Sequence, residues 1–328
     1  MDSGAAAFEA RRKVGIGHIA RGVLQVTGRD ARTFLNGLVT NDVLQMRSGD
    51  CRYAALLDHR GRALADLWIY DVDAGFLVDV DAALREKVRS LLETGRVSED
   101  VHVLDRSEDF ARYTVVGEQA PDLIHSRFGG APPELGRWAE IPAGLIARTD
   151  ALMAPGFELF LDPASPAIAA MTADDAVELL PATLEVLRLE SGGPRYGIDF
   201  DEETILLEAP LESAVSFTKG CYVGQEVISR VANRGHLRHA IVRLLLETSP
   251  PRPHDVVQQE GLAVGQVTSA AFSSGIGKSI AFARVLIEAS APGNSVTVIT
   301  AEGPRHATVV GAPPLGGPLA PGAAKIPS

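Results

Sequence analysis

The chain changes texture at Ala240, and this change constrains the fold more than any other feature of the sequence. From there, five short runs of β-forming residues follow one another, separated by turns rich in Pro and Gly (240–246, 262–268, 280–287, 295–300 and 306–310). Short strands at even spacing, with no helical stretch between them, are typical of a small barrel or sandwich. We therefore expect an all-β unit at the C-terminal end, preceded by a longer unit of another class.

The longer N-terminal part mixes helical and strand patterns, and its second half echoes its first. Gly28 and Gly117 each follow a strand-like run and precede a short helical stretch. Gly75 and Gly156 are each followed by Phe and open a strand that ends at an Asp. The offsets are 89 residues (28 to 117) and 81 residues (75 to 156). This repetition predicts an α+β domain made of two related halves.

One short segment, 219–226 (KGCYVGQE), gathers most of the reactive chemistry of the chain. It combines a cation, a thiol, an amide and a carboxylate with two glycines that allow a sharp turn. Cys221 is one of only two cysteines, and the neighbouring Lys219 could favour its thiolate. The alternative is a small buried Cys in a glycine turn, and the residue types do not choose between the two. Cys51 is expected to pack as a small hydrophobe where a strand begins.

Two carboxylates stand out because each is expected to lie among apolar side chains. Glu190 lies close to the end of a predicted helix and on its packed side, where a carboxylate needs a partner. That partner is either the polar edge of a ligand ring or a structural donor such as a backbone N–H or Arg195. Asp66 alternates with apolar residues in the strand-like run 63–70, and burial there would raise its pKa, as a general base requires. The alternative for Asp66 is an edge strand that reaches water.

Charge, cysteine usage and hydropathy limit the class of protein. The net charge of −11 argues against non-specific nucleic-acid binding by the whole surface. No apolar run is long enough to span a membrane, no signal-peptide pattern begins the chain, and two cysteines make no disulfide framework, so we expect a cytoplasmic protein. No metal site is predicted. A basic island beside the 219–226 loop is either a solvated rim or a surface for a polyanionic ligand tail (Lys219, Arg230, Arg234, Arg238 and Arg243).

Several segments together resemble one family. The 219–226 segment is similar to the KGC[FY]xGQE signature of the YgfZ-type folate-binding proteins, which are relatives of the T-protein (aminomethyltransferase) of the glycine cleavage system. The likeness extends to 34–42 (FLNGLVTND), 187–192 (LRLESG), 194–199 (PRYGID) and 265–269 (GQVTS). An eight-residue match with ordered flanks is a far more specific signal than a lone glycine pattern.

The resemblance covers roughly residues 14–310 and implies a fold. It implies an α+β class with a duplicated folate-binding domain (8–236, its two halves meeting near 105–112). A small C-terminal β-barrel (237–312) would follow, and the parts would form a ring-like arrangement. The stretch 313–328, rich in Gly, Pro and Ala, is expected to be a disordered tail.

The resemblance also implies a site for tetrahydrofolate. Glu190 matches the T-protein glutamate that holds the pterin ring, and Asp66 matches the aspartate near the reactive nitrogens of the folate. We expect Cys221, Lys219 and Asp66 to carry the chemistry and the basic island to receive the glutamate tail of the folate. Further folate contacts are expected from residues of the flanking motifs (Arg195, Tyr196, Gln225, Glu226 and Arg230). Where many relatives carry Pro-Gln-Glu, this chain has Leu206-Leu207-Glu208, which leaves the placement of Glu208 open.

For function, the resemblance implies a tetrahydrofolate-binding accessory protein that supports assembly or repair of iron–sulfur clusters in client enzymes, including tRNA-modifying enzymes. Its partners would be folate and those clients or cluster carriers, and Cys221 would meet a labile cluster or a folate adduct. The main alternative is an aminomethyltransferase that produces methylene-tetrahydrofolate, so the question of enzyme or accessory factor stays open. A third alternative is a binding module without folate chemistry.

Overall fold

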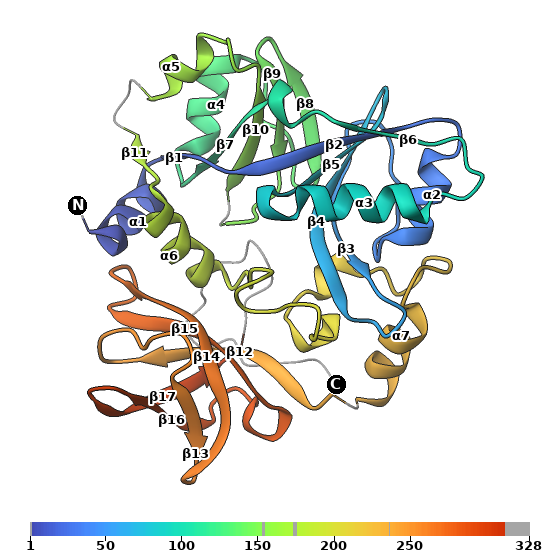
Figure 1. Ribbon diagram of the computed structural model, residues 1–328. Helices are drawn as coiled ribbons and strands as arrows, with labels where there is room; N and C mark the ends of the chain where they lie inside the picture. The colour runs from blue at the N-terminus through green and yellow to red at the C-terminus, as the bar shows by residue number, and fades with distance from the viewer. Residues whose placement is uncertain (1, 153–154, 173–175, 236, 312–328) are drawn as a thin grey trace.

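A computed structural model shows two β-sheets with helices on their outer faces, followed by a barrel (Figure 1). The structure describes residues 2–152, 155–172, 176–235 and 237–311. The predicted tail, 313–328, lies outside the described residues. Among the residues described, no helix combines the length and the apolarity needed to cross a membrane.

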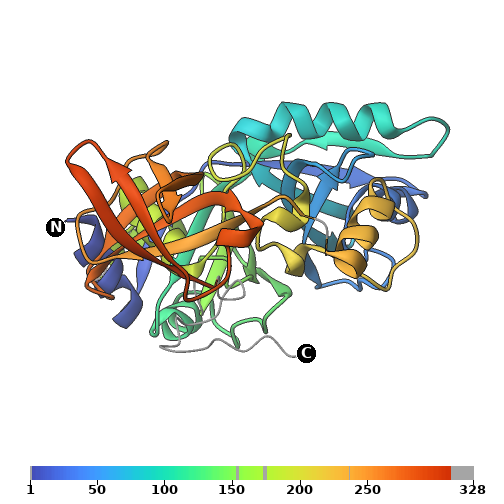
Figure 2. The same ribbon diagram turned by 90° about the horizontal axis from the view of Figure 1, so that it is seen from below.

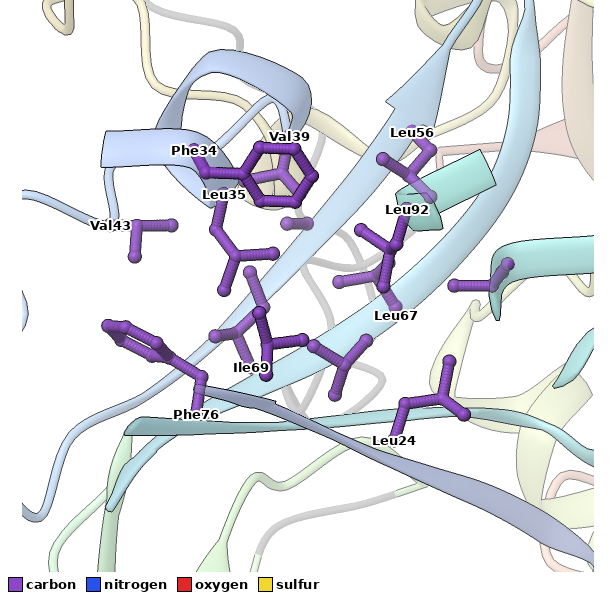
Figure 3. Packing of buried hydrophobic residues seen from close by; sticks show 14 of the residues in the cluster. Leu24, Phe34, Leu35, Val39, Val43, Leu56, Leu67, Ile69, Phe76 and Leu92 are labelled. Atoms are coloured by element: carbon purple, nitrogen blue, oxygen red, sulfur yellow. The ribbon is translucent and has the colours of Figure 1, made fainter. Parts of the chain in front are cut away.

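The first sheet has five strands, and two helices cover its outer face. Alternating apolar residues of the central strands, such as Leu67 and Ile69, pack against Phe34 and Leu35 of the first covering helix (Figure 3). Asp81 begins the segment that leads into the second covering helix, accepting a hydrogen bond from Ala83 N–H. The strand order is β3 (Cys51–Leu57), β4 (Ala63–Val72), β5 (Gly75–Asp81), β2 (Arg21–Thr27), β6 (His102–Asp105), and the helices are α2 (Ala31–Leu38), η1 (Ala82–Leu84) and α3 (Arg85–Gly95).

The second sheet has six strands and its own helical cover. The two short strands at one edge come from distant parts of the chain, one from the N-terminus and one from just before helix α6. The order is β11 (Val177–Glu178), β1 (Gly15–His18), β7 (Ala111–Val116), β10 (Gly156–Leu161), β9 (Gly144–Arg148), β8 (Arg137–Ile141), and the helices are α4 (Ala120–Phe128) and α5 (Ala167–Thr172), with η2 (Ser107–Asp109) between the two sheets in sequence.

The predicted duplication is confirmed by topology and register. The orders β3-β4-β5-β2 and β8-β9-β10-β7 are the same, and each final strand leads into a covering helix. Val26 pairs with Phe76 in the first sheet, as Val115 pairs with Phe157 in the second. Gly28 and Gly117 share the same unusual backbone, with φ of 113° and 116°. The sequence did not reveal that β1 joins the second sheet.

The inner faces of the two sheets pack against each other, and this inter-sheet layer is apolar at one end and charged at the other. At the apolar end, Tyr70 of β4 meets Phe160 of β10 edge to face, with ring centroids 4.9 Å apart. Because side chains alternate along a strand, Asp66 lies on the same face as Tyr70, and Glu158 on the same face as Phe160. The strands therefore carry carboxylates between the sheets as well as core.

The predicted C-terminal barrel is confirmed as a closed six-stranded barrel. Its interior consists of small and branched apolar side chains such as Val267, Ala283 and Val298, each fully buried. The sequence missed only the short strand β13. The barrel order is β12 (His239–Leu246), β15 (Lys278–Leu286), β14 (Leu262–Ser273), β13 (Val256–Gln259), β16 (Ser295–Thr300), β17 (Gly303–Val310), with η5 (Ile287–Ala289) after β15.

The barrel is held to the sheets by α6 (Pro181–Ser191) and the segment that follows it. Gly192, in the left-handed conformation with φ of 80°, ends this helix as expected. Figure 2 shows the barrel on one side, the first sheet with α3 on the other, and the segment around 200–215 between them. The remaining helices are α1 (Ser3–Arg12), η3 (Leu206–Glu208), η4 (Glu212–Ala214) and α7 (Gln225–Arg234).

Candidate functional site

The 219–226 loop displays its cysteine at the surface and buries its lysine. Cys221 is exposed, whereas Cys51 is buried at the first position of β3, as predicted. Lys219 Nζ donates to three backbone carbonyls at the end of α2, those of Asn36 (2.6 Å), Val39 (2.8 Å) and Asn41 (2.8 Å). A cation at a helix C-terminus satisfies carbonyls that the helix leaves unpaired. Lys219 therefore anchors the loop to α2, and burial lowers the pKa of Lys219 to about 8.

The rest of this motif enters helix α7 rather than a strand. Gly224, with φ of 82°, forms its N-cap, and a Cβ there would lie 2.6 Å from the carbonyl oxygen of Asp58, so only glycine fits. Gln225 is the first helical residue. Glu226 and Arg230 form an exposed ion pair one turn apart. The structure thus places these three predicted folate contacts on a surface helix beside the β3–β4 turn.

Asp66 lies half-buried on β4 and accepts a hydrogen bond from Tyr53 Oη at 2.8 Å. Burial raises the pKa of Asp66, although the Tyr53 hydrogen bond and the nearby Arg21 oppose the shift. The raised pKa that the strand pattern predicted is therefore confirmed in direction.

Two other predicted residues are attached to the strands beside Asp66. Arg195 Nη2 lies 3.0 Å from the carboxylate of Asp81 on β5. Lys87 Nζ bridges the carbonyl oxygen of Leu64 (2.6 Å) and Tyr196 Oη (2.8 Å). Among the described residues, neither Arg195 nor Tyr196 makes a hydrogen bond or ion pair with Asp66 itself, so their part in a shared site stays a prediction.

Glu190 has structural partners from two elements that the sequence did not connect with it. Its side chain is fully buried, Ser273 Oγ of the barrel donates to Oε1, and Arg11 Nε of α1 forms an ion pair with Oε2 at 2.9 Å. The partner is therefore Arg11 rather than Arg195. Its role as the pterin ligand stays a prediction.

Glu190 is one of three buried carboxylates that dock the barrel. Asp199 accepts from Thr268 and Ser269 of β14, both at 2.6 Å, and Glu208 lies 3.0 Å from Arg284 of β15. All three acids belong to the short segment 190–208. This segment joins the sheets to the barrel, and Glu208 takes its place in it as a partner of Arg284.

The strongest cluster of buried charge was missed by sequence reasoning. Arg112 of β7 reaches across the inter-sheet layer to Asp79 of β5 at 2.7 Å, with both side chains 2% exposed. Glu158 lies beside them, 3.9 Å from Arg112, and burial raises the pKa of Glu158 to about 7 despite that attraction. A signal was available, because Glu158 is the one charge in the apolar run 156–161 (GFELFL).

The basic island predicted beside the loop is not a continuous surface. Lys219 is committed to α2, and Arg243 is 2% exposed and donates to the carbonyl oxygens of Glu190 (3.0 Å) and Gly311 (2.9 Å). Arg230 is on the surface but is paired with Glu226. Charges adjacent in sequence therefore point to different parts of the molecule, and Lys219 and Arg243 are not available at the surface. The Arg234 side chain lies outside the described residues, and a role of the remaining members in binding a folate tail stays a prediction.

Two open clefts border the first sheet, and neither contains a predicted site residue. One, of about 320 Å³, lies at the apolar end of the inter-sheet layer, next to Leu77, Phe110 and Trp138. The other, of about 380 Å³, adjoins Arg32 and Asp71. In the described ranges, no three His, Cys, Asp or Glu side chains group in a way that could hold a metal ion.

Known protein families match both parts of this fold. Residues 7–219 match the GCVT N-terminal domain, and residues 240–315 match the glycine cleavage T-protein C-terminal barrel domain. The crystal structure of the glycine cleavage system aminomethyltransferase T from Bartonella henselae superposes with a TM-score of 0.86 at 22% identity. The match covers 95% of this chain and 89% of that one, and it shows the shared fold.

Sequence relatives agree across most of the chain. An aminomethyltransferase from Rubrobacter xylanophilus is 34% identical over 80% of this chain and 73% of its own length. One from Streptomyces coelicolor is 32% identical over 83% and 78%, and a probable aminomethyltransferase from Haloarcula marismortui is 30% identical over 87% and 83%. With both domains matched in order, the chain belongs to the glycine cleavage T-protein family.

Proposed function

We propose that the protein binds tetrahydrofolate at the charged end of the inter-sheet layer and takes part in one-carbon transfer. Its relatives are named aminomethyltransferases, which supports this kind of reaction. The observation that carries the proposal is the pair of carboxyls Asp66 and Glu158, one from each sheet, both with pKa values raised by burial. Perturbed acids gathered between two halves of a domain are typical of a functional site.

The residues at this place fit a reduced pterin. The 2-amino and N3–H groups of a pterin form a donor edge, and a carboxylate such as Glu158 can accept both hydrogen bonds. Arg112 Nε is buried and has no hydrogen-bond partner among the described residues, so this layer retains unused polar capacity. Glu158 is therefore our candidate for the pterin ligand, and Glu190 is the alternative suggested by the family resemblance.

Asp66 is our candidate for moving a proton. Tyr53 Oη fixes one of its oxygens, and the raised pKa brings its protonation closer to neutral pH, where a general acid or base works best. When bound, tetrahydrofolate supplies the two nitrogens that accept a one-carbon unit, N5 of the pterin ring and N10 outside it. Arg195, which pairs with Asp81 of β5, and Tyr196, which Lys87 links to β4, would border the ligand.

Transfer to tetrahydrofolate is testable directly. Purified protein would be supplied with tetrahydrofolate and a lipoyl carrier that bears an aminomethyl group, and methylene-tetrahydrofolate would be measured. We expect formation that depends on Asp66, with an Asp66→Asn variant slowed by about 100-fold or more. Absence of product with a competent carrier would reject the transferase and leave the folate-binding part of the proposal to a binding assay.

A second candidate function is supported by the exposure of Cys221. In that case the protein would be a cytoplasmic folate-binding accessory factor for iron–sulfur client enzymes, as the YgfZ-type signature suggests. The two candidates differ in what Cys221→Ala does. An accessory factor would lose support of cluster enzymes in cells while folding normally, whereas a transferase would keep its product formation. Normal cluster-enzyme activity with the Ala variant would remove the second candidate.

A further inference from the structure

Arg21 of β2 is a charged side chain of the inter-sheet layer that is partly exposed to water. Its Nε donates to Asp79 Oδ1 at 3.0 Å and its Nη2 donates to the Asp79 carbonyl oxygen at 3.1 Å. These two bonds fix the plane of the guanidinium. Within the part of the chain that the structure describes, Nη1 has no hydrogen bond. The Arg21 side chain is 22% exposed, against 2% for Asp79 and Arg112 and 10% for Glu158.

Asp66 and Glu158, which come from different sheets, are both close enough to interact electrostatically with the Arg21 guanidinium. The charged end of the layer therefore presents two acceptors together with a donor whose orientation is fixed by Asp79. Arg21 uses two of its three nitrogens on Asp79, an acid that Arg112 also neutralises at 2.7 Å.

This pattern is complementary to one edge of a 4-oxo pterin. The 2-amino and N3–H groups donate, and the 4-oxo oxygen next to them accepts. A carboxylate can accept from the 2-amino and N3–H groups, and a guanidinium N–H can then donate to the 4-oxo oxygen. A 2,4-diamino pteridine has a 4-amino donor where that acceptor was, and its N3 carries no proton. A fixed N–H of Arg21 would then face another N–H, and a donor left unpaired in a site of this kind is costly.

We propose that Arg21 is a specificity-determining residue, which selects 4-oxo over 4-amino pteridines by donating from Nη1 to the 4-oxo oxygen. The inference rests on the proposed folate site and adds to it a residue and a rule of selection. Arg21 would thus bind the ligand in addition to pairing with Asp79.

The test compares tetrahydrofolate with tetrahydroaminopterin, which has a 4-amino group in place of the 4-oxo oxygen and no N3–H, by calorimetry on the full chain. The wild type is expected to prefer tetrahydrofolate by more than about tenfold, because the two ligands differ in the group that faces Arg21 and in one donor to the carboxylate. Arg21→Gln is expected to reduce this ratio by about tenfold, mainly through weaker binding of tetrahydrofolate, since the loss of N3–H acts equally in both proteins. Arg32→Gln is the matched control, because Arg32 is also a half-buried arginine paired with an acid (Asp71, 2.7 Å), and should leave the ratio unchanged.

The outcomes separate the inference from the function on which it rests. If neither ligand binds the wild type, the proposed folate site fails. If tetrahydrofolate binds but the two ligands bind equally well, or the ratio survives in Arg21→Gln, the role of Arg21 is overturned while folate binding stands. Should Arg21→Gln fold poorly, an Arg21→Lys variant decides, since Lys keeps the charge but lacks the fixed guanidinium fork and should also reduce the ratio.

Discussion

Replacing Glu190 by Gln separates a structural carboxylate from a ligand-binding one. Breaking a buried ion pair costs about 3–5 kcal/mol when one charge stays buried and unpaired. Here the cost should be lower, because the Arg11 side chain is 25% exposed and can return to water, and its contact with Glu190 is close without being aligned as a hydrogen bond. Gln also retains an acceptor for Ser273. We therefore expect a loss of about 2 kcal/mol in the free energy of unfolding.

The assay is urea denaturation followed by circular dichroism, with tetrahydrofolate affinity measured in parallel. Arg11→Met and the double variant complete a cycle, in which we expect a coupling of about 1–2 kcal/mol between Glu190 and Arg11. If Glu190 serves mainly to dock α1 and the barrel, folate affinity stays within about twofold of the wild type. A tenfold loss of folate affinity with an unchanged urea midpoint would refute this reasoning and restore Glu190 as the pterin ligand.

Three further predictions follow from the same contacts. Burial raises the folded-state pKa of Glu158 to about 7, so the folded protein retains this proton after the unfolded chain has lost it. The free energy of unfolding should therefore fall as pH rises from about 5 to 8. In urea titrations at a series of pH values, Glu158→Gln should remove up to about 3 kcal/mol of that fall. Lys219→Met leaves three carbonyls at the end of α2 without their donor, so we expect the free energy of unfolding to fall by about 2–3 kcal/mol. Amide exchange across 216–224, measured by mass spectrometry, should become faster. Unchanged exchange would argue against Lys219 as the anchor of the loop. Gly224→Ala should cost about 1–3 kcal/mol in thermal unfolding because its φ is positive and its Cβ meets Asp58, while Gly220→Ala, with open space around it, should cost less than about 0.5 kcal/mol; equal costs would contradict the predicted constraint.

The fold was predictable because its signals are local. Strand alternation, the glycines at 28 and 117 and the turn-rich texture after Ala240 each reflect backbone requirements that act within a few residues. The likeness of the two sheets followed from the repetition. The sequence did not predict the non-local addition of β1 to the second sheet. A strand of four residues near the N-terminus carries no pattern that indicates its pairing with the distant strand β7.

The site was harder to predict because a side chain's role depends on what faces it. Lys219 lies two residues from Cys221 in sequence, yet its ammonium belongs to the end of α2. Glu190 and Glu158 are both acids among apolar neighbours, and only the structure shows that one meets the barrel and the other faces the opposite sheet. Periodicity correctly gave burial and the raised pKa of Asp66 but could not give the partner across the layer.

The central claim is that a reduced folate binds between the two sheets and depends on Glu158. Calorimetric titration of tetrahydrofolate into the wild type and into Glu158→Gln tests it most directly. We predict saturable one-to-one binding to the wild type and an affinity at least about tenfold lower for the variant, because a carboxylate that accepts two N–H donors is replaced by an amide that accepts fewer. Equal affinity of the two proteins, or no heat from the wild type at high ligand concentration, would contradict it.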